Sequence, residues 1–297
     1  MQFIQKYFGA LLLLSCFAGM FLPSMGESTN SIVIIALGFI IFFSFFQVNF
    51  NYRFLVSDIR LSISFWFIRF LMLPVIAFLT VKRISEFHAL ILLLSLLLPS
   101  AVSSPSFSVI FKGRPDISIK ILVFSSFLSV ITIPVLSSLF VGSGINLPAG
   151  KMLLTLIYTI LIPFIFHLPL RKIRNIRSFT EKYNALLTLT GLSVIFIMVT
   201  ARNKSFILEY PWQVGLYALE AIVLYAFMYS AGYLILPGQN KNTRRTLSIS
   251  SGANNIGLGV TITALFFPGN MNIFFIVAQI VWIIAIIPLR WIFKIHR

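Results

Sequence analysis

The sequence predicts an all-α integral membrane protein of about ten transmembrane helices, arranged as two inverted repeats of five, from its composition and its hydropathy pattern. Hydrophobic residues make up 59% of the 297 residues, charged residues make up 10%, and the mean hydropathy is +0.99. Soluble domains are only about 45–50% apolar. Apolar stretches of about 20 residues, which cross a hydrocarbon core of about 30 Å as a helix, recur along the whole chain. The alternating segments of about ten residues that build membrane barrels do not recur in it.

Each apolar stretch predicts one membrane helix. We expect these helices at residues 8–24, 31–50, 61–81, 87–111, 117–141, 150–170, 184–201, 211–236, 246–267 and 271–293. The connections between them are short, so the chain leaves no room for a separate soluble domain.

The positive charge of the chain, +16 in total, is distributed unevenly between the predicted loops. Of the 23 Lys and Arg residues, 17 fall at the termini or in every second loop, 5 fall in the remaining loops, and Arg69 lies within a helix. Because basic residues collect on the cytoplasmic side, we predict a multi-pass protein of the inner or plasma membrane with both termini cytoplasmic. The basic loops then attract anionic membrane lipids, and nucleic acid is not an expected partner.

The first predicted helix also has features of a signal peptide with a lipoprotein-type cleavage site at Leu13-Leu14-Ser15-Cys16. We expect it to be retained, because its removal would leave an odd number of helices and disturb the charge alternation. Cys16 is the only cysteine, so neither a disulfide framework nor a cysteine metal site is predicted. Metal-site spacing is also missing from the three histidines, which we expect at surfaces or interfaces: His88, His167 and His296.

A weak internal similarity indicates two halves of five helices, residues 1–145 and 146–297. Ser125 precedes Pro134 by nine residues, and Gln279 precedes Pro288 by the same spacing. An odd number of helices in each half places the halves in opposite orientations, which is the inverted repeat common among transporters.

The fourth helix of each half is difficult to keep helical. One contains Pro99 and Pro105 among serines, and the other contains Gly252 and the pair Asn254-Asn255. Proline removes an amide donor, and β-hydroxyls compete for backbone hydrogen bonds. Freed backbone groups at membrane depth need protein or a water-filled cavity to satisfy them, so these two interruptions predict the substrate and ion site. Kinks used for close helix packing are the alternative.

These residues resemble the bile acid:sodium symporter family, whose members have ten helices in two inverted repeats with broken fourth and ninth helices. The family's ninth helix begins Arg-Thr-Val-Ser and continues through a Glu and a Gln-Asn pair; the matching positions here are Arg245-Thr246-Leu247-Ser248, Ser250 and Asn254-Asn255. In the fourth helix, Pro99, Ser104 and Lys112-Gly113 match the family's pattern, although Pro105 replaces an Asn. The resemblance implies a core domain of helices 3–5 and 8–10 and a panel domain of helices 1, 2, 6 and 7.

The resemblance also implies sodium sites, at which this sequence departs from the family. Ser250 stands where the family has a carboxylate, and Arg69 stands where it has a glutamine that helps to ligate the second sodium. Hydroxyls ligate a cation without neutralising it, and a guanidinium repels it. The ion ligands that remain, in a degenerate set, are Ser104, Ser125, Ser129, Ser250, Ser251 and Asn254.

We hypothesise that Arg69 is a tethered substitute for the second sodium, which holds the carbonyl ends of a broken helix and attracts an anion. Transport would then depend less on sodium than in the family. The alternative is that Arg69 snorkels to the lipid headgroups.

Glu220 is the other ionisable residue within a predicted helix, and carboxylates in membranes are functional candidates. Its helix is the repeat mate of the helix that carries Arg69, so the two side chains are expected to approach each other. Either they form a structural pair, or Glu220 is buried and neutral, or it titrates as a proton-coupling group.

The sequence therefore predicts a secondary active transporter without a cofactor, with Na⁺ or H⁺ as its coupling ion. By resemblance the substrate is a small organic anion, such as a steroid-like or small carboxylate, and its predicted contacts are Arg69, Ser104, Ser106, Asn254 and Asn255. No phosphate loop, Ser/His/Asp set or paired carboxylates are present, so an enzyme is not predicted. Two alternatives stay open: a proton- or potential-driven efflux carrier of the auxin-efflux or arsenite-efflux type, and a non-transporting sensor or scaffold with the same fold. Neither the direction of transport nor the oligomeric state is indicated.

Overall fold

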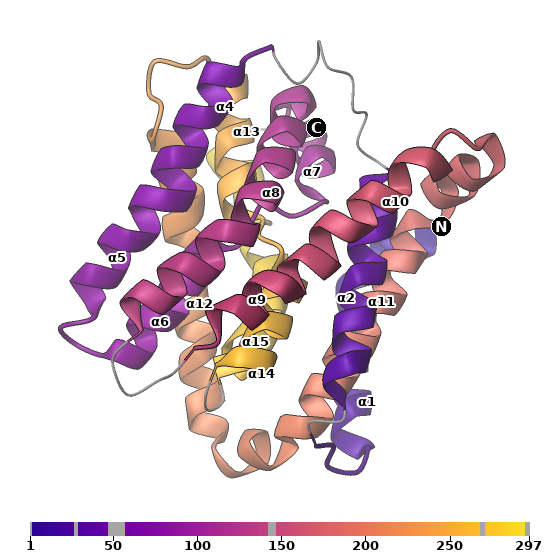
Figure 1. Cartoon of the computed structure of the whole chain (residues 1–297). Helices are drawn as coiled ribbons and strands as arrows, with labels where there is room; N and C mark the ends of the chain where they lie inside the picture. Colours follow the sequence, from indigo (N-terminus) through magenta and orange to yellow (C-terminus); the bar gives the residue numbers. More distant parts are fainter. Residues whose placement is uncertain (1, 27–28, 47–56, 142–146, 268–270, 295–297) are drawn as a thin grey trace. The chain divides into compact units, whose positions relative to one another are not determined.

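The computed structural model describes residues 2–26, 29–46, 57–141, 147–267 and 271–294, and within these ranges the regular elements are helices (Figure 1). Five helical segments there are long and apolar enough to cross a membrane: Ile59–Val81, Pro115–Phe140, Ala149–Leu170, Arg174–Glu209 and Pro211–Leu234. Shorter apolar helices are Ala10–Phe21, Asn30–Phe45, Glu86–Leu97, Ile256–Phe266 and Met271–Trp282. The all-α class is confirmed, whereas ten membrane helices in an inverted repeat stay a prediction.

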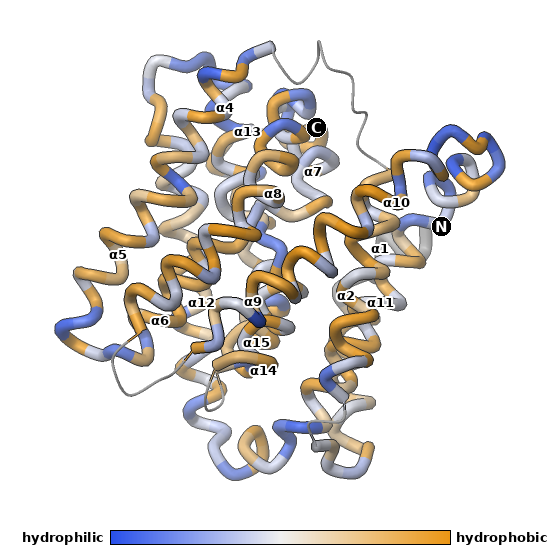
Figure 2. Tube along the Cα trace, in the orientation of Figure 1, coloured by the Kyte–Doolittle hydropathy of each residue, from blue (hydrophilic) through white to orange (hydrophobic). Residues whose placement is uncertain are grey.

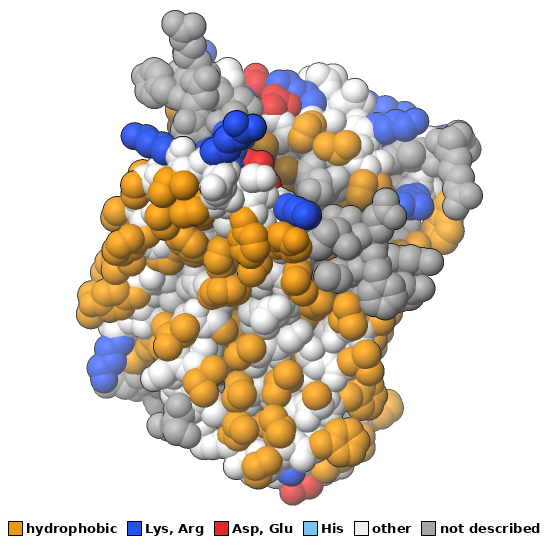
Figure 3. Space-filling view, turned by 90° about the vertical axis from the view of Figure 1, so that its right-hand side faces the viewer, with side chains coloured by type: hydrophobic (Ala, Val, Ile, Leu, Met, Phe, Trp, Pro, Cys, Tyr) orange, Lys and Arg blue, Asp and Glu red, His pale blue; other side chains and the backbone are white. Residues whose placement is uncertain are grey.

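Hydrophobic residues line most of the helices, and hydrophilic residues gather mainly at helix ends and connections (Figure 2). Many of the hydrophobic side chains point outward: Ile222 and Val223 are 53% and 62% exposed. Figure 3 shows such side chains over a broad area of one face. A surface of this kind suits contact with lipid tails rather than with water.

The described helices belong to two compact units. Unit 1 consists of Met1–Asn49, Pro148–Leu216 and Gly257–Ile280, and unit 2 consists of Phe50–Leu147, Tyr217–Ile256 and Val281–Arg297. Unit 1 contains α1 (Gln2–Phe21), α2 (Asn30–Phe45) and the helices of the predicted sixth and seventh spans, but it also takes in parts of the predicted ninth and tenth. The predicted core and panel domains therefore stay a prediction.

In unit 1, α11 (Arg174–Glu209) packs along α1 and α2. The approach to α1 is close: a Cβ atom at Gly19 would lie 2.6 Å from the carbonyl oxygen of Ile197. Small residues allow membrane helices to approach in this way. The expected bounds of 184–201 for this helix are wrong, because its polar first turns are also helical. Arg177 and Glu181 form an i,i+4 ion pair there, with 2.7 Å between Nε and Oε1, and such pairs support exposed helix that a hydropathy pattern does not detect.

Unit 2 begins with one continuous helical segment that contains a wide turn. Its parts are α4 (Ile59–Trp66), the π-helical turn η2 (Phe67–Met72) and α5 (Leu73–Val81). In unit 1, α9 (Ala149–Leu156), η3 (Ile157–Leu161) and α10 (Ile162–Leu170) repeat the pattern. In both segments a proline, Pro74 or Pro163, follows the π turn by two residues. Proline has no amide hydrogen to donate to the hydrogen bond that continues an α-helix, so the helical turn beside it is wider.

The remaining helices of unit 2 are α6 (Glu86–Leu97), α7 (Ser104–Ile110), α8 (Pro115–Phe140), most of α12 (Pro211–Leu234), α13 (Lys241–Gly252) and α16 (Leu289–Ile292). Their shared core includes side chains that are at most 2% exposed: Phe65, Phe70, Ile117, Ile121 and Leu247. This core joins the segment that carries Arg69 to α8 and α13, and so positions the residues described below.

Both expected breaks are present. The first interruption, Leu98–Ser103, separates α6 from α7, and the second interruption, Ala253–Asn255, separates α13 from α14 (Ile256–Phe266). Leu98 has φ −59° and ψ 134°, the extended conformation that a following proline favours. Pro105 lies in the first turn of α7, where its missing amide hydrogen is not needed.

The two prolines of the weak internal similarity behave differently. Pro134 lies inside α8, which continues through it. Pro288 instead follows the end of α15 (Met271–Ala285) and precedes α16. The expected single helix at 271–293 is therefore wrong, because the chain leaves the α-helical conformation before Pro288.

Candidate functional site

The two interruptions of unit 2 lie side by side and are joined through their backbones. Ser100 and Asn254 form an isolated antiparallel bridge. The amide of Ala101 donates to the carbonyl of Ala253 at 2.6 Å, and the amide of Asn255 donates to the carbonyl of Pro99 at 2.8 Å. Backbone groups that the broken helices leave unpaired thus find partners at membrane depth, as they must.

Arg69 lies on η2 and reaches the same place. Its side chain is 0% exposed, so the alternative that it snorkels to the headgroups is wrong. Nη1 donates to the carbonyl of Leu96 at 2.9 Å, Nη2 donates to the carbonyl of Ser251 at 2.7 Å, and Nε donates to the Ser251 hydroxyl at 2.6 Å. One guanidinium therefore binds the last turns of both α6 and α13.

The charge of Arg69 suits this position. The last carbonyls of a helix have no partner in the helix, and its C-terminus behaves roughly as half a negative charge. Two C-termini meet at Arg69, so together they offer about one negative charge to one guanidinium. No acidic residue occurs in the segments that build the crossing, residues 59–81, 95–111, 117–140 and 241–256. The negative charge that Arg69 meets there thus comes from helix ends rather than from a carboxylate.

The predicted ion-ligand serines are buried and bonded to protein atoms. The Ser104 hydroxyl donates to the carbonyl of Ala101 and lies 2.7 Å from the Ser100 hydroxyl. Ser125 accepts from the amide of Ser100 at 3.1 Å and donates to the carbonyl of Leu122 at 3.2 Å. Ser129 donates to the carbonyl of its own helix at Ser126, 2.8 Å away. These bonds use the hydroxyl protons, so lone pairs remain for a ligand but no formal charge does.

Two further predicted ligands, Ser250 and Ser251, lie on α13. Ser251 contacts α12, and Ser250 contacts α8. The Ser251 hydroxyl accepts from Arg69 and donates to the carbonyl of Met228 at 2.6 Å. The Ser250 hydroxyl lies 3.1 Å from the hydroxyl of Ser118, and both side chains are 0% exposed. The position that would hold a carboxylate by resemblance is therefore a neutral hydroxyl pair.

The predicted substrate contacts differ in how they are placed. Asn254 is 6% exposed; its Nδ2 donates to the carbonyl of Ser95 at 2.5 Å, and its Oδ1 has no hydrogen-bond partner among the described residues. Asn255 is partly exposed. Ser106, on the exposed side of α7, is not brought into the bonded crossing. Asn254 thus presents a buried amide oxygen beside the bridge, the kind of group that fixes a polar ligand.

The expected approach of Glu220 to Arg69 is wrong. Glu220 Oε1 instead lies 2.9 Å from Nε2 of His88. The Arg69 cluster is linked to α12 at Met228, whose carbonyl accepts a hydrogen bond from Ser251. Met228 lies eight residues after Glu220, or about 12 Å along the helix at the usual rise. Of the other histidines, His167 is buried where α10 packs on α2, against Phe164 and Phe45, and His296 lies outside the described residues.

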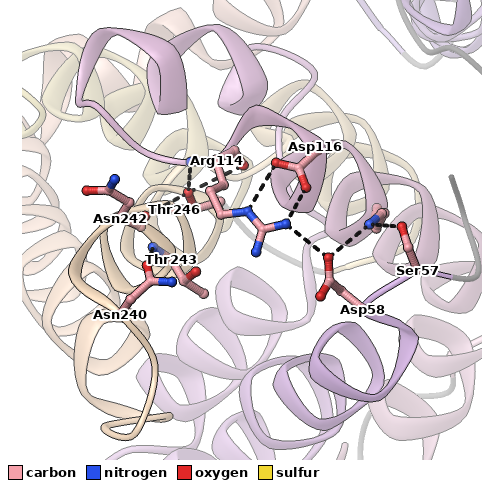
Figure 4. Close-up of polar contacts among 9 residues, drawn as sticks. Ser57, Asp58, Arg114, Asp116, Asn240, Asn242, Thr243 and Thr246 are labelled. Carbon is pink, nitrogen blue, oxygen red and sulfur yellow. Dashed lines mark hydrogen bonds and ion pairs between the residues drawn. The ribbon is translucent and has the colours of Figure 1, made fainter.

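A second polar cluster, absent from the sequence predictions, joins the start of α4, the start of α8 and α13 (Figure 4). Arg114 lies between two carboxylates, with Nη2 at 2.7 Å from Asp116 and 3.0 Å from Asp58. The hydrogen bond to Asp116 raises the pKa of Arg114 above its ordinary value. The amide of Arg114 donates to the Thr246 hydroxyl at 2.5 Å, and Lys120 Nζ donates to Ser57 at 2.8 Å.

Sequence reasoning also missed Ser100, Ser118 and His88 as partners of the predicted residues. A signal existed for Ser100, which lies in the same serine-rich break as Ser104. Ser118 and His88 had none, since their partners are 132 residues away in each case.

The model of one protein family matches the chain. It is described as the sodium bile acid symporter family and covers residues 26–210, which is 185 of the 297 residues. The matched segment includes Arg69 and the first interruption and ends before α13. No protein of curated function matches the sequence significantly.

Proposed function

Because the chain belongs to the sodium bile acid symporter family, and is therefore a multi-pass membrane transporter rather than an enzyme, we propose that it carries a small organic anion without sodium at one family ion site. In this proposal the guanidinium of Arg69 takes the place of the second sodium ion. The carrier is a secondary transporter, as its family is. The other family ion site has the neutral Ser250 hydroxyl where the resemblance places a carboxylate, so we extend the proposal to that site, and the coupling then rests on another ion.

The observation that carries the proposal is the set of bonds from Arg69 to the carbonyl ends of α6 and α13. A sodium ion at this position would bind such carbonyl oxygens, because hard cations prefer oxygen ligands. With the guanidinium already there, a second cation would be repelled, and no carboxylate occurs in residues 59–81, 95–111, 117–140 or 241–256 to offset the repulsion. The anionic class of the substrate rests on the resemblance to the family, since two helix ends already offset the charge of Arg69.

The test is uptake into proteoliposomes that contain the purified protein. The probes are a radiolabelled, taurine-conjugated bile acid and a radiolabelled small carboxylate, each offered under an inward sodium gradient and under an equal potassium gradient. We expect saturable uptake of at least one probe, with equal initial rates in sodium and in potassium. Strict dependence of that uptake on sodium would contradict the proposal.

Two variants sharpen this test. Arg69→Gln restores the glutamine that the resemblance places there, so we expect its uptake to fall in potassium and to recover in sodium. Arg60→Gln removes an exposed positive charge from the same helical segment and is expected to behave as the wild type. If Arg69→Gln keeps the wild-type rate and cation dependence, Arg69 is not an ion substitute.

The same assay separates the other candidate functions. Flux of the probe that responds only to membrane potential, and to neither a sodium nor a proton gradient, favours a carrier of the efflux type. Binding or flux of neither probe under any gradient favours a non-transporting sensor or scaffold.

A further inference from the structure

A contact between a histidine and a glutamate lies outside the crossing, on two helices that also contribute to the crossing. His88 lies in the first turn of α6, and Glu220 lies in the first half of α12, with 2.9 Å between Nε2 and Oε1. The side chains of His88 and Glu220 are 44% and 35% exposed. The pair therefore lies at the surface of the protein rather than in its core.

The hydrogen bonds around His88 allow a specific arrangement of its protons. Ser85 is the N-cap residue of α6, and its hydroxyl oxygen accepts from the amide of His88 at 3.4 Å. The same hydroxyl lies 2.8 Å from Nδ1 of the imidazole. If the hydroxyl donates to Nδ1, the neutral ring carries its proton on Nε2 and donates it to the Glu220 carboxylate. The pair then has one vacant proton position, on Nδ1.

Uptake of one proton changes this arrangement in a defined way. The proton binds Nδ1, the Ser85 hydroxyl rotates so that its oxygen accepts from Nδ1–H, and the imidazole becomes positively charged. The hydrogen bond from the neutral ring to the Glu220 carboxylate becomes an ion pair between two charged groups, which is shorter and stronger.

The position of the pair connects it with the crossing. Leu96, which accepts from Arg69, lies eight residues after His88 on α6, and Met228, which accepts from Ser251, lies eight residues after Glu220 on α12. Both spacings correspond to about 12 Å of helix. The two helices are thus linked twice, once through His88 and Glu220 and once through Arg69 and Ser251.

Few other ionisable groups lie on the elements that pack around the pair. On α12, Tyr217 lies one turn before Glu220, and its ring stacks on Phe87 with 6.5 Å between centroids. On α6, Glu86 precedes His88 by two residues. The segment that leads from α5 into α6 carries Lys82 and Arg83, and the ionisable residues of α8, Asp116 and Lys120, lie in its first turns.

We propose that the His88–Glu220 pair is the proton-binding site that couples transport to a pH gradient. The inference rests on the proposed function, because it supplies the coupling ion of a carrier that works without sodium at the Arg69 site. The protonated pair holds α6 against α12. A conformation in which these two helices separate at this end breaks the ion pair and releases the proton, so proton binding on one side of the membrane and release on the other drive the cycle.

The experiment compares two modes of transport in the same proteoliposomes, with the taurine-conjugated bile acid and the small carboxylate as probes. Exchange of labelled for unlabelled probe needs no net proton movement, whereas accumulation under an imposed pH gradient does. We expect His88→Gln and Glu220→Gln each to retain exchange and to lose the accumulation driven by the pH gradient, a loss of about 5- to 150-fold if the coupling is of ordinary strength. The double variant should lose no more than either single variant.

Two controls mark the effect as specific to the pair. Tyr217→Phe keeps the ring on Phe87 and removes the neighbouring phenol, and Glu86→Gln removes the neighbouring carboxylate. Both should keep accumulation driven by the pH gradient.

Retained accumulation in His88→Gln or Glu220→Gln would overturn the coupling role and leave the proposed function standing. The coupling role would also be overturned if the wild type exchanged the probe but did not accumulate it under a pH gradient. Absence of exchange in the wild type would remove the proposed function, and this inference with it.

Discussion

The two interruptions at the crossing are built from different residues. The first, Leu98–Ser103, contains Pro99 and is followed by Pro105, and two prolines six residues apart strongly disfavour an ordinary α-helix through it. The second, Ala253–Asn255, contains no proline and is half as long, with three residues instead of six. Covalent structure thus accounts for the first break, whereas the second depends on its surroundings.

The surroundings of the second interruption are Arg69, Tyr229 and the first interruption itself. Arg69 binds the end of α13, the ring of Tyr229 lies against Gly252, and the bridge pairs Asn254 with Ser100. We conclude that the second break exists because the tertiary contacts made there stabilise the chain more than a continued helix would. The first break should then tolerate change better than the second.

The largest effect is expected from Arg69→Met, which removes the contact shared by both interruptions. It leaves the carbonyls of Leu96 and Ser251 without their donor, which lowers the free energy of unfolding by about 1–3 kcal/mol for each buried group. Relief of the cost of burying a charge offsets part of this loss. We expect a lower midpoint of thermal unfolding in detergent, with Arg69→Lys intermediate because a lysine keeps the charge but not the fork of donors.

A midpoint for Arg69→Met equal to that of the wild type would show that the two breaks do not depend on Arg69. Arg60→Met serves as the control, since Arg60 is exposed on the same segment.

A smaller effect is expected from Gly252→Ala, which acts on the second interruption alone. A methyl group at this position would overlap the ring of Tyr229, which is 4% exposed. Overpacking of this kind costs about 1–3 kcal/mol. The measurement is again thermal unfolding, and Gly238→Ala, with no atom within 4 Å of the new carbon, should leave the midpoint unchanged.

If Gly252→Ala is as stable as Gly238→Ala, the contact with Tyr229 does not define the end of α13. In a variant that also carries Tyr229→Leu, the effect of the alanine should shrink, because residues in contact do not act additively.

The smallest effect is expected from Pro99→Ala. The proline contributes its carbonyl to the amide of Asn255, and alanine keeps that carbonyl. The expected loss, about 0.4–1 kcal/mol, comes from the greater freedom of the unfolded chain. Circular dichroism should show no gain in helix, because Pro105 remains and clashes with the preceding turn; a gain would mean that Pro99 alone keeps the first interruption open.

The breaks themselves were predictable from the sequence, and so was the presence of Arg69 near them. Prolines, glycines and hydroxyls change local backbone preferences, which a sequence displays directly. The partners of Arg69 were not predictable, because Leu96 and Ser251 lie 27 and 182 residues away. They meet Arg69 because of the way in which three helices are oriented about their axes. No single residue in the sequence indicates that orientation.

The pairing of Glu220 was predicted wrongly for the same reason. Repeat symmetry suggested Arg69, but the level of a residue along its helix decides which group it meets, and His88 lies at the level of Glu220. The length of α11 was missed on other grounds, since its exposed, charged turns lack the apolar pattern by which the remaining helices are recognised.

The π-helical turn that carries Arg69 has a consequence for comparing this chain with its relatives. Such a turn holds one residue more than an α-helical turn, which amounts to a single-residue insertion that leaves the helix intact. Against a relative whose helix lacks the turn, an ungapped alignment is correct on one side of Phe67–Met72 and displaced by one position on the other. One position turns a side chain by about 100° around a helix. Homologous site residues along this segment should therefore be identified first by the direction of their side chains in the structure, and only then by their position in the sequence alignment.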